Sequence, residues 1–285
     1  MNAGDIAFPN LGIYLKDVPK SFSIFGFSIA FYGLIIGTGV LAGILMAAYM
    51  AKKSGQNPDD YWDFAIYAVI FSIIGGRIYY VIFAWDYYKD DLAGIFRLRN
   101  GGMAIYGAVI AAFITLFVYC KVKKKNPLLM GDTAIPGLIL GQAVGRWGNF
   151  MNREVFGEYY DGLFSMQLPV DAVRARDISD NIAAHIPEGA NYINVHPTFL
   201  YESVWNLLVF AALLCFRKHK KFHGELCLIY LGGYGLGRFI IEGIRTDTLF
   251  IPGTTVPVSQ VLALLMFVFA VGADILVRIK MKHKS

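Results

Sequence analysis

One polar segment stands out in this apolar sequence: Gly145-Arg146-Trp147-Gly148-Asn149-Phe150-Met151-Asn152-Arg153-Glu154. It closes an apolar, glycine-rich run from Thr133 to Val144 that is typical of a membrane-buried helix. An arginine at a bilayer centre costs roughly 2.5–3.5 kcal/mol, so Arg146 is predicted to have a function. The alternative is a simple helix end, in which Asn149 caps the helix and Arg153 extends toward the lipid headgroups.

The composition indicates that the solvent for most of this chain is a lipid bilayer. Of its 285 residues, 56% are hydrophobic and only 16% are charged, whereas soluble domains carry about 25% charged residues. The net charge of +5 does not indicate a nucleic-acid partner, because the basic residues cluster in short loops between apolar runs.

Seven apolar runs have the length of about 20 residues that crossing a bilayer requires. The predicted fold is therefore an all-α polytopic membrane protein, a single integral membrane domain over residues 1–285. The spans are expected near 24–50, 62–84, 103–120, 132–150, 197–216, 225–245 and 258–279. Basic clusters such as 121–125 and 217–221 place the N-terminus outside and the C-terminus in the cytoplasm.

Two segments between the spans are long. Trp85 to Gly102 is aromatic and charged, so it could lie along the membrane interface. Residues 152–196 are expected to form a small extracytoplasmic domain between the fourth and fifth helices, with mixed strand and helix signals. Glycines spaced four apart, as in Gly39-x3-Gly43 and Gly137-x3-Gly141-x3-Gly145, are best explained by close helix packing.

The three cysteines (Cys120, Cys215 and Cys227) lack metal-ligand spacing and fall at predicted cytoplasmic helix ends. Neither a metal site nor a disulfide framework is expected. The first 20 residues do not have the pattern of a cleavable signal peptide.

Polar residues from five predicted spans fall at one depth. With a rise of about 1.5 Å per residue, they lie roughly 18–22 Å from the cytoplasmic helix ends. They are Arg77, Tyr106, Arg146, Glu202 and Arg238. Because charges in hydrocarbon must pair or face water, these groups are expected to meet in the outer half of the membrane.

The sixth span carries a polar stripe with helical spacing, formed by Tyr234, Arg238, Glu242 and Arg245. Arg238 and Glu242 could simply be an ion pair that holds the bundle together. The span arginines Arg77, Arg146 and Arg238 nevertheless outnumber the glutamates Glu202 and Glu242. Because a guanidinium fork suits phosphate, the excess positive charge predicts an anionic phospholipid as ligand.

Four motifs in order resemble the signatures of the phosphatidylglycerol–prolipoprotein diacylglyceryl transferases of bacterial membranes. They are Gly101-Gly102-Met103-Ala104-Ile105-Tyr106-Gly107; Gly145-Arg146-x-Gly148-Asn149-Phe150-x-Asn152-x-Glu154-x-x-Gly157; His196-Pro197-Thr198-x-Leu200-Tyr201-Glu202; and Tyr234-Gly235-x-x-Arg238-Phe239-x-x-Glu242-x-x-Arg245. Together with the predicted spans they cover essentially the whole chain.

The resemblance implies that the diacylglyceryl group of phosphatidylglycerol is transferred to the lipobox cysteine thiol in the signal peptide of a prolipoprotein. Glycerol 1-phosphate leaves, and no cofactor is needed. It also implies a multi-pass protein of the bacterial cytoplasmic membrane with its active site toward the outer leaflet.

By motif match, Arg146 and Arg238 correspond to the family's essential arginines, which would stabilise the leaving phosphate. Tyr106 stands where many members have histidine, and it is a candidate for orienting or deprotonating the thiol. The expected substrate-binding residues are Arg146, Tyr32, Asn149, Asn152, Glu154, Gly157, His196, Tyr234, Glu242 and Arg245. For His196, a structural role at the start of a helix is at least as well supported.

A transporter of an anionic lipid or organic anion is the alternative function, because buried arginines and glutamates also line such proteins. The chain lacks the internal repeat that marks many transporters.

Overall fold

The computed structural model describes residues 1–98 and 101–283. The chain divides into two compact units. Unit 1 comprises Met1–Gly43 and Pro136–Ser285, and unit 2 comprises Ile44–Ile135.

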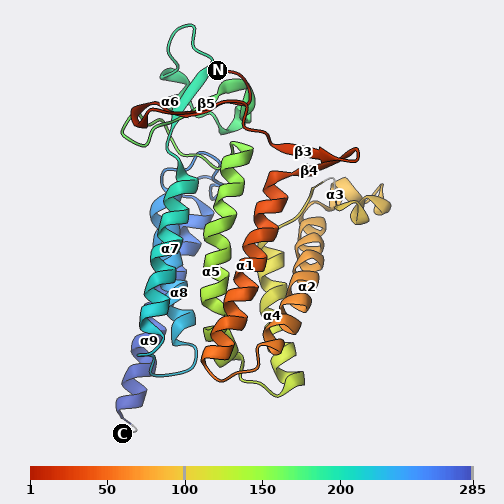
Figure 1. Cartoon of the computed structure of the whole chain (residues 1–285), viewed down its shortest axis with the longest axis vertical. Helices are drawn as coiled ribbons and strands as arrows, with labels where there is room; N and C mark the ends of the chain where they lie inside the picture. Colours follow the sequence, from red (N-terminus) through yellow and green to blue (C-terminus); the bar gives the residue numbers. More distant parts are fainter. Residues whose placement is uncertain (99–100, 284–285) are drawn as a thin grey trace. The chain divides into compact units, whose positions relative to one another are not determined.

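Within the described residues, six helices are long and apolar enough to cross a membrane. They are α1 (Phe31–Lys53), α2 (Asp59–Phe83), α4 (Ile105–Lys123), α5 (Pro127–Asn152), α7 (Thr198–Phe216) and α9 (Val258–Lys282) (Figure 1). The chain is therefore a mostly helical, polytopic membrane protein.

The predicted span 225–245 corresponds to α8 (Glu225–Glu242), which is not among those six helices. Its 18 residues include Glu225, Arg238 and Glu242, and these charges lower its hydropathy. It is nevertheless packed in the bundle, because Trp205 of α7 donates its indole N–H to the Gly233 carbonyl of α8 at 2.8 Å. The seven-span topology stays a prediction.

The first predicted span begins too early. Residues 24–30 do not extend α1; they belong to a hairpin of β3 (Ser21–Ile24) and β4 (Phe27–Ala30). Serine alternates with apolar residues here, which favours a strand, and Phe25 and Gly26 turn the chain with φ of 50° and 82°. The helix starts only at Phe31.

A four-stranded antiparallel sheet forms in unit 1, in the order β2 (Ile13–Leu15), β1 (Ile6–Phe8), β5 (Met166–Pro169) and β6 (Tyr192–Val195). The short helices of this region are α6 (Asp180–Ala184) and the 3-10 turns Pro9–Leu11, Val170–Ala172 and Ala175–Asp177. The all-α prediction is thus incomplete, and the insertion 152–196 is not self-contained, because N-terminal strands complete its sheet.

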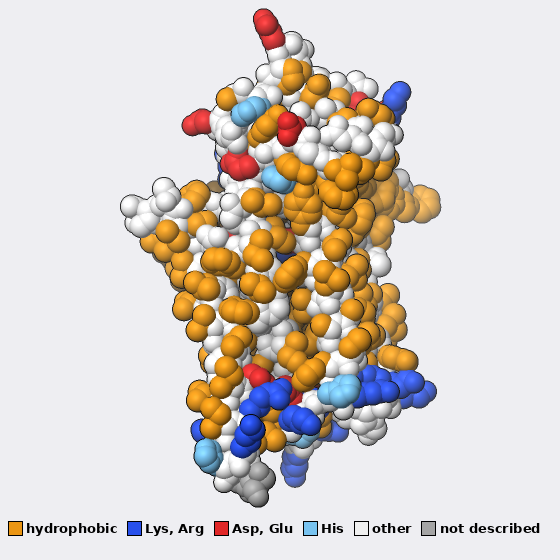
Figure 2. Space-filling view, turned by 90° about the vertical axis from the view of Figure 1, so that its left-hand side faces the viewer, with side chains coloured by type: hydrophobic (Ala, Val, Ile, Leu, Met, Phe, Trp, Pro, Cys, Tyr) orange, Lys and Arg blue, Asp and Glu red, His pale blue; other side chains and the backbone are white. Residues whose placement is uncertain are grey.

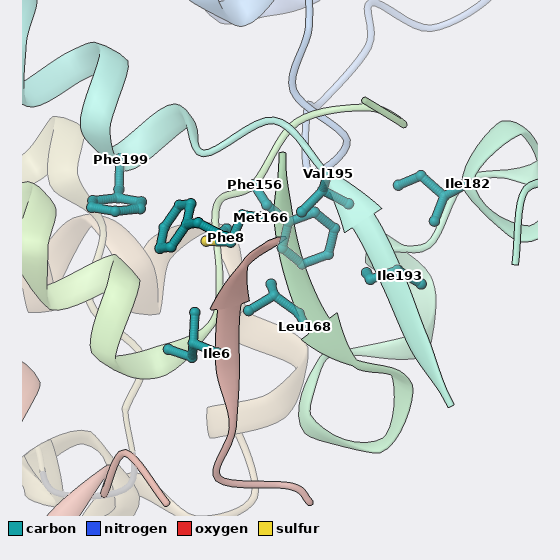
Figure 3. Packing of buried hydrophobic residues seen from close by; sticks show 9 residues of the cluster. All are labelled: Ile6, Phe8, Phe156, Met166, Leu168, Ile182, Ile193, Val195 and Phe199. Carbon is teal, nitrogen blue, oxygen red and sulfur yellow. The ribbon is translucent and has the colours of Figure 1, made fainter. Parts of the chain in front are cut away.

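The sheet packs against the first turn of α7 through one apolar cluster (Figure 3). Its buried members are Ile6, Phe8, Phe156, Met166, Leu168, Ile182, Ile193, Val195 and Phe199. Phe199 belongs to α7, and Phe156 lies just beyond the end of α5. The cluster therefore fixes the segment that follows α5 next to the beginning of α7.

Glycines bring helix backbones together in both units, and the four-residue spacing predicted this for the pairs in unit 1. In unit 1, a Cβ added at Gly39 of α1 would lie 2.8 Å from the Gly141 carbonyl oxygen of α5, and one at Gly43 would lie 2.7 Å from that of Gly137. In unit 2, a Cβ at Gly107 of α4 would lie 2.4 Å from the Gly75 carbonyl oxygen of α2.

In unit 2, the described part of the segment from Trp85 to Gly102 includes α3 (Trp85–Tyr88) and a 3-10 helix over Leu92–Phe96. Their expected place at the membrane interface stays a prediction. Figure 2 shows hydrophobic side chains along the helices of this face and basic side chains gathered at their lower end. The last turn of α9 contains Lys280 and Lys282.

Candidate active site

The centre of unit 1 is the Glu202 carboxylate of α7, whose side chain is 6% exposed and is surrounded by three arginines. Arg146 of α5 places its Nε 2.5 Å from Glu202 Oε2, and Arg238 of α8 places a terminal nitrogen 3.0 Å from Oε1. Arg245, just beyond α8, lies 3.4 Å away. Three segments of the chain thus converge on one buried carboxylate.

Glu242 forms a second anionic point of the same network. Arg238 spans both carboxylates, since its other terminal nitrogen lies 2.7 Å from Glu242. The Ser259 hydroxyl of α9 also donates to Glu242. The i, i+4 ion pair of Arg238 and Glu242, which the sequence offered as the alternative to a ligand-binding role, is thus present.

Asp247 completes the network and was missed from the sequence. Arg245 donates to both carboxylate oxygens of Asp247, at 2.9 and 2.8 Å. The spacing Arg245-x-Asp247 was a usable signal, but Asp247 lies outside the predicted span.

The predicted excess of positive charge is wrong for this network. Three arginines (Arg146, Arg238 and Arg245) face three carboxylates (Glu202, Glu242 and Asp247). The count from the sequence included Arg77, which belongs to unit 2, and left out both Arg245 and Asp247. An anion site must therefore rest on which donors remain free, and not on net charge.

Arg146 has the donors that the other arginines lack. Its ion pair with Glu202 is made through Nε, and its side chain is 20% exposed. Among the described residues, neither terminal nitrogen of Arg146 has a hydrogen-bond partner. In contrast, Arg238 directs its two terminal nitrogens at Glu202 and Glu242. Arg146 therefore presents an open guanidinium edge, which suits a phosphate oxygen pair.

A second polar group forms at the end of α5. The side-chain amides of Asn149 and Asn152 donate to Glu154 Oε1 at 3.2 and 3.3 Å. Arg174, from the segment between α5 and α7, lies 3.2 Å from Glu154 Oε2. The three signature residues predicted to bind substrate are thus brought together around one carboxylate.

The backbone around Glu154 is held in an unusual conformation, since the residues on either side, Arg153 and Val155, have φ of 56° and 60°. Non-glycine residues rarely adopt such angles, which mark strained and often functional positions. Arg153 is buried and does not extend toward lipid headgroups: its guanidinium donates to the carbonyls of Gly4 at 2.5 Å and Val18 at 2.6 Å. It ties the N-terminal segment to this turn.

Tyr32 of α1 lies against α5 at Gly148. A Cβ at Gly148 would lie 2.9 Å from the Tyr32 ring, so glycine is needed for this approach. An apolar groove of about 440 Å³ runs beside it between α1, α5 and α7. It is lined by Leu34, Ile35, Thr38, Ala143, Val144, Trp147, Ser203 and Leu207.

Gly157 and His196 support the site through backbone and ring contacts. The Gly157 N–H donates to the His196 carbonyl at 3.0 Å, and Gly157 forms a bridge to Arg245. The His196 ring stacks on Tyr160 with ring centres 4.1 Å apart, and burial lowers the pKa of His196. Tyr234 stacks on Tyr230 at 5.7 Å.

Tyr106 and Arg77 belong to unit 2, so their expected place in one layer with Arg146 stays a prediction. Tyr106 is in the first turn of α4 with its side chain 42% exposed, and its ring centre lies 6.4 Å from that of Tyr79. The cysteines Cys120, Cys215 and Cys227 form no disulfide bond. No cluster that could hold a metal is found among the described residues.

Arg77 is buried and bonded to backbone carbonyls. It donates at 2.7 Å to the carbonyl oxygens of Gly94, Ile95, Gly101 and Gly102. It therefore orders the glycine motif that leads into Tyr106.

Comparison with known proteins identifies relatives over nearly the whole chain. Residues 19–276 match the family model described as prolipoprotein diacylglyceryl transferase. The chain is 37% identical over 265 residues to a phosphatidylglycerol–prolipoprotein diacylglyceryl transferase of Clostridioides difficile, covering 92% of this chain and 96% of the relative. It is 42% identical to a protein of the same name from Listeria monocytogenes, covering 92% of this chain and 91% of the relative. It is 38% identical to one from Staphylococcus aureus, covering 92% of this chain and 90% of the relative.

Proposed function

The chain belongs to the prolipoprotein diacylglyceryl transferase family, and on this basis we propose that it transfers the diacylglyceryl group of phosphatidylglycerol to the lipobox cysteine of a prolipoprotein. This transferase reaction is the first step of lipoprotein maturation. The observation that carries the proposal for the site is the open edge of Arg146, which is held by Glu202 on its other side.

In the reaction, the cysteine thiolate attacks the glycerol carbon that bears the phosphate. A sulfur–carbon bond forms, the carbon–oxygen bond to phosphate breaks, and glycerol 1-phosphate leaves with the bonding electrons. Negative charge therefore grows on the phosphate. Fixed N–H donors aimed at such charge in a site with little water stabilise the transition state. We assign this role to the terminal nitrogens of Arg146.

Arg238 has a different proposed part in the same step. Its guanidinium is divided between Glu202 and Glu242, so it keeps Glu202 in place and adds positive potential at the phosphate. Glu202 in turn fixes the Nε side of Arg146. Arg245 and Asp247 complete this support, and the Gly157 bridge anchors Arg245.

The group around Glu154 is assigned to the lipid headgroup. The glycerol head of phosphatidylglycerol carries hydroxyl groups, which donate to carboxylates and accept from amides. Glu154, Asn149 and Asn152 offer both kinds of partner, and Tyr32 lies against the same helix. The apolar groove beside Trp147 suits an acyl chain.

Tyr106 is proposed to orient or deprotonate the thiol. His196 and Tyr234 are proposed as supporting residues, because their contacts are with other aromatic rings.

The proposed setting is the bacterial cytoplasmic membrane. The chain forms one integral membrane domain with seven spans, the N-terminus outside and the C-terminus in the cytoplasm. The basic residues at the end of α9 support this orientation, which places the active site toward the outer leaflet.

One assay tests the proposal. Purified protein is mixed with phosphatidylglycerol and a lipobox peptide, and mass spectrometry is used to detect the diacylglyceryl thioether. The adduct is expected with phosphatidylglycerol, with little formed from phosphatidylethanolamine. A transporter would give no adduct with either lipid.

A further inference from the structure

The hairpin of β3 and β4 presents an apolar surface that the predicted reaction does not use. It extends from the start of α1 (Figure 1), and its base is closed by a hydrogen bond from the Phe31 N–H to the Lys20 carbonyl at 3.0 Å. At the tip, the Phe25 side chain is 97% exposed. A two-stranded hairpin alone is only marginally stable in water, so something is expected to cover it.

The strand register sorts the hairpin into two faces. Residues paired across the strands share a face, and successive residues alternate. The pairs Phe22–Ile29 and Ile24–Phe27 therefore make one apolar face, whereas the pairs Ser21–Ala30 and Ser23–Ser28 make the other. A hairpin with one apolar and one polar face is suited to lie between the hydrocarbon core and the headgroups of a membrane.

The apolar face continues directly into a membrane helix. No charged residue occurs from Ser21 to Ala51, and α1 starts one residue after β4. The 23 residues of α1 span about 34 Å by themselves, enough to cross the hydrocarbon core. The hairpin is therefore not needed for crossing, and its position in the chain puts it at the level of the membrane interface.

We propose that the hairpin is a lipid-binding element that lies in the membrane interface. Phe22, Ile24, Phe27 and Ile29 face the acyl chains, the serines face the headgroups, and Phe25 inserts at the tip. Phenylalanine on the apolar face of an amphipathic element is buried at the boundary between headgroups and acyl chains. The bilayer is the occupant rather than a peptide or a second copy, because the apolar face is continuous with the exposed apolar residues of α1, such as Leu34 and Leu41.

Fluorescence quenching tests the proposal in the full chain. The variant Phe25→Trp is placed in phosphatidylcholine vesicles whose acyl chains carry bromine, without any precursor peptide. The parent has four tryptophans, so its emission is subtracted to leave the signal of the new Trp at position 25. This signal is expected to be quenched by bromine in the acyl chains and protected from iodide in the water. The matched control is Glu188→Trp in the exposed loop before β6, where iodide should quench and bromine should not.

Two neighbouring substitutions then test the division into faces. In the Phe25→Trp background, Phe27→Lys is expected to abolish the bromine quenching, whereas Ser28→Lys leaves it unchanged. Iodide quenching of Phe25→Trp without bromine quenching would overturn the proposal. Bromine quenching that appears only after a lipobox peptide is added would also overturn it, because the precursor would then be the occupant. Bromine quenching only at high protein density would overturn it as well, because a second copy would then cover the hairpin.

Discussion

Two arginines look alike in the sequence and differ in the structure. Arg77 and Arg146 both interrupt apolar helices, but all three nitrogens of Arg77 donate to carbonyl oxygens in unit 2. Arg146 in unit 1 is held through Nε alone. An arginine with all its donors used shapes the chain, and one with free donors can bind a ligand. The difference is in the donors, since both residues carry the same charge.

The largest loss of stability and activity is expected when Glu202 is replaced, because its carboxylate pairs with three arginines. Glu202→Gln leaves Arg146, Arg238 and Arg245 with one fewer anion. Breaking a buried ion pair in this way costs about 3–5 kcal/mol. Chemical unfolding in detergent is expected to show this loss, together with near-complete loss of transfer. The exposed control Glu188→Gln should behave as the parent, and an equally stable Glu202→Gln protein would contradict the ion-pair network.

Tyr106→Phe comes next, because it removes one hydroxyl from the proposed thiol-orienting residue. If this hydroxyl acts on the thiol, the initial rate falls roughly 10²–10⁴-fold. Tyr106→His is expected to retain activity and to gain a dependence on pH near neutrality, because imidazole titrates there. Rates against pH for the three proteins check this. A Phe variant as fast as the parent would remove Tyr106 from the chemistry.

Glu154→Gln tests the second polar group with a smaller expected effect. The amide keeps the size of the side chain but weakens the bonds from Asn149 and Asn152. Loss of one or two such bonds corresponds to roughly a tenfold loss in rate. The effect is expected in the concentration of phosphatidylglycerol needed for half-maximal rate. A change in thermal stability without a change in the kinetics would instead show that Glu154 has a structural role and does not bind the substrate.

The smallest effect concerns His196, whose pKa is lowered by burial from its usual 6.5. The folded chain therefore binds this proton less readily than the unfolded chain. Its stability contribution is complete above the unfolded pKa and is lost as pH falls through the folded pKa. As the pH falls from the unfolded to the folded pKa of His196, the Tm of the parent is expected to decrease by less than about 4 °C. The decrease in Tm is expected to be smaller in His196→Gln. Identical pH dependence in both proteins would exclude the residue as the source.

Local patterns predicted much of this structure. Helical spacing was enough to pair Arg238 with Glu242, and the length of the apolar runs located the helices to within a few residues, apart from the start of α1. Long-range partners were not accessible. The pairing of β1 with β5 joins Ala7 to Gln167, and no local signal encodes it. The carbonyl partners of Arg77 were equally hidden, because backbone acceptors are present at every residue.

The start of α1 was misplaced for a related reason. Hydrophobicity alone does not separate a strand from a helix in a short apolar run, and the serine alternation in Ser21–Ala30 was the decisive signal. Similarly, Arg174 reaches Glu154 only because the segment after α5 folds back, and its position in the sequence does not predict this.

In the proposed reaction, the free edge of Arg146 acts on the phosphate, and its charge alone does not suffice. The most direct test is the initial rate of thioether formation per folded molecule in the parent, Arg146→Lys and Arg77→Lys. Lysine keeps the charge but not the planar fork. We expect Arg146→Lys to lose about 10²–10³-fold in rate, the size of effect seen when one transition-state donor is removed, with normal stability. Arg77→Lys should lose stability and keep its rate per folded molecule to within a few-fold. A fast Arg146→Lys enzyme, or equal rate losses in both variants, would contradict the account.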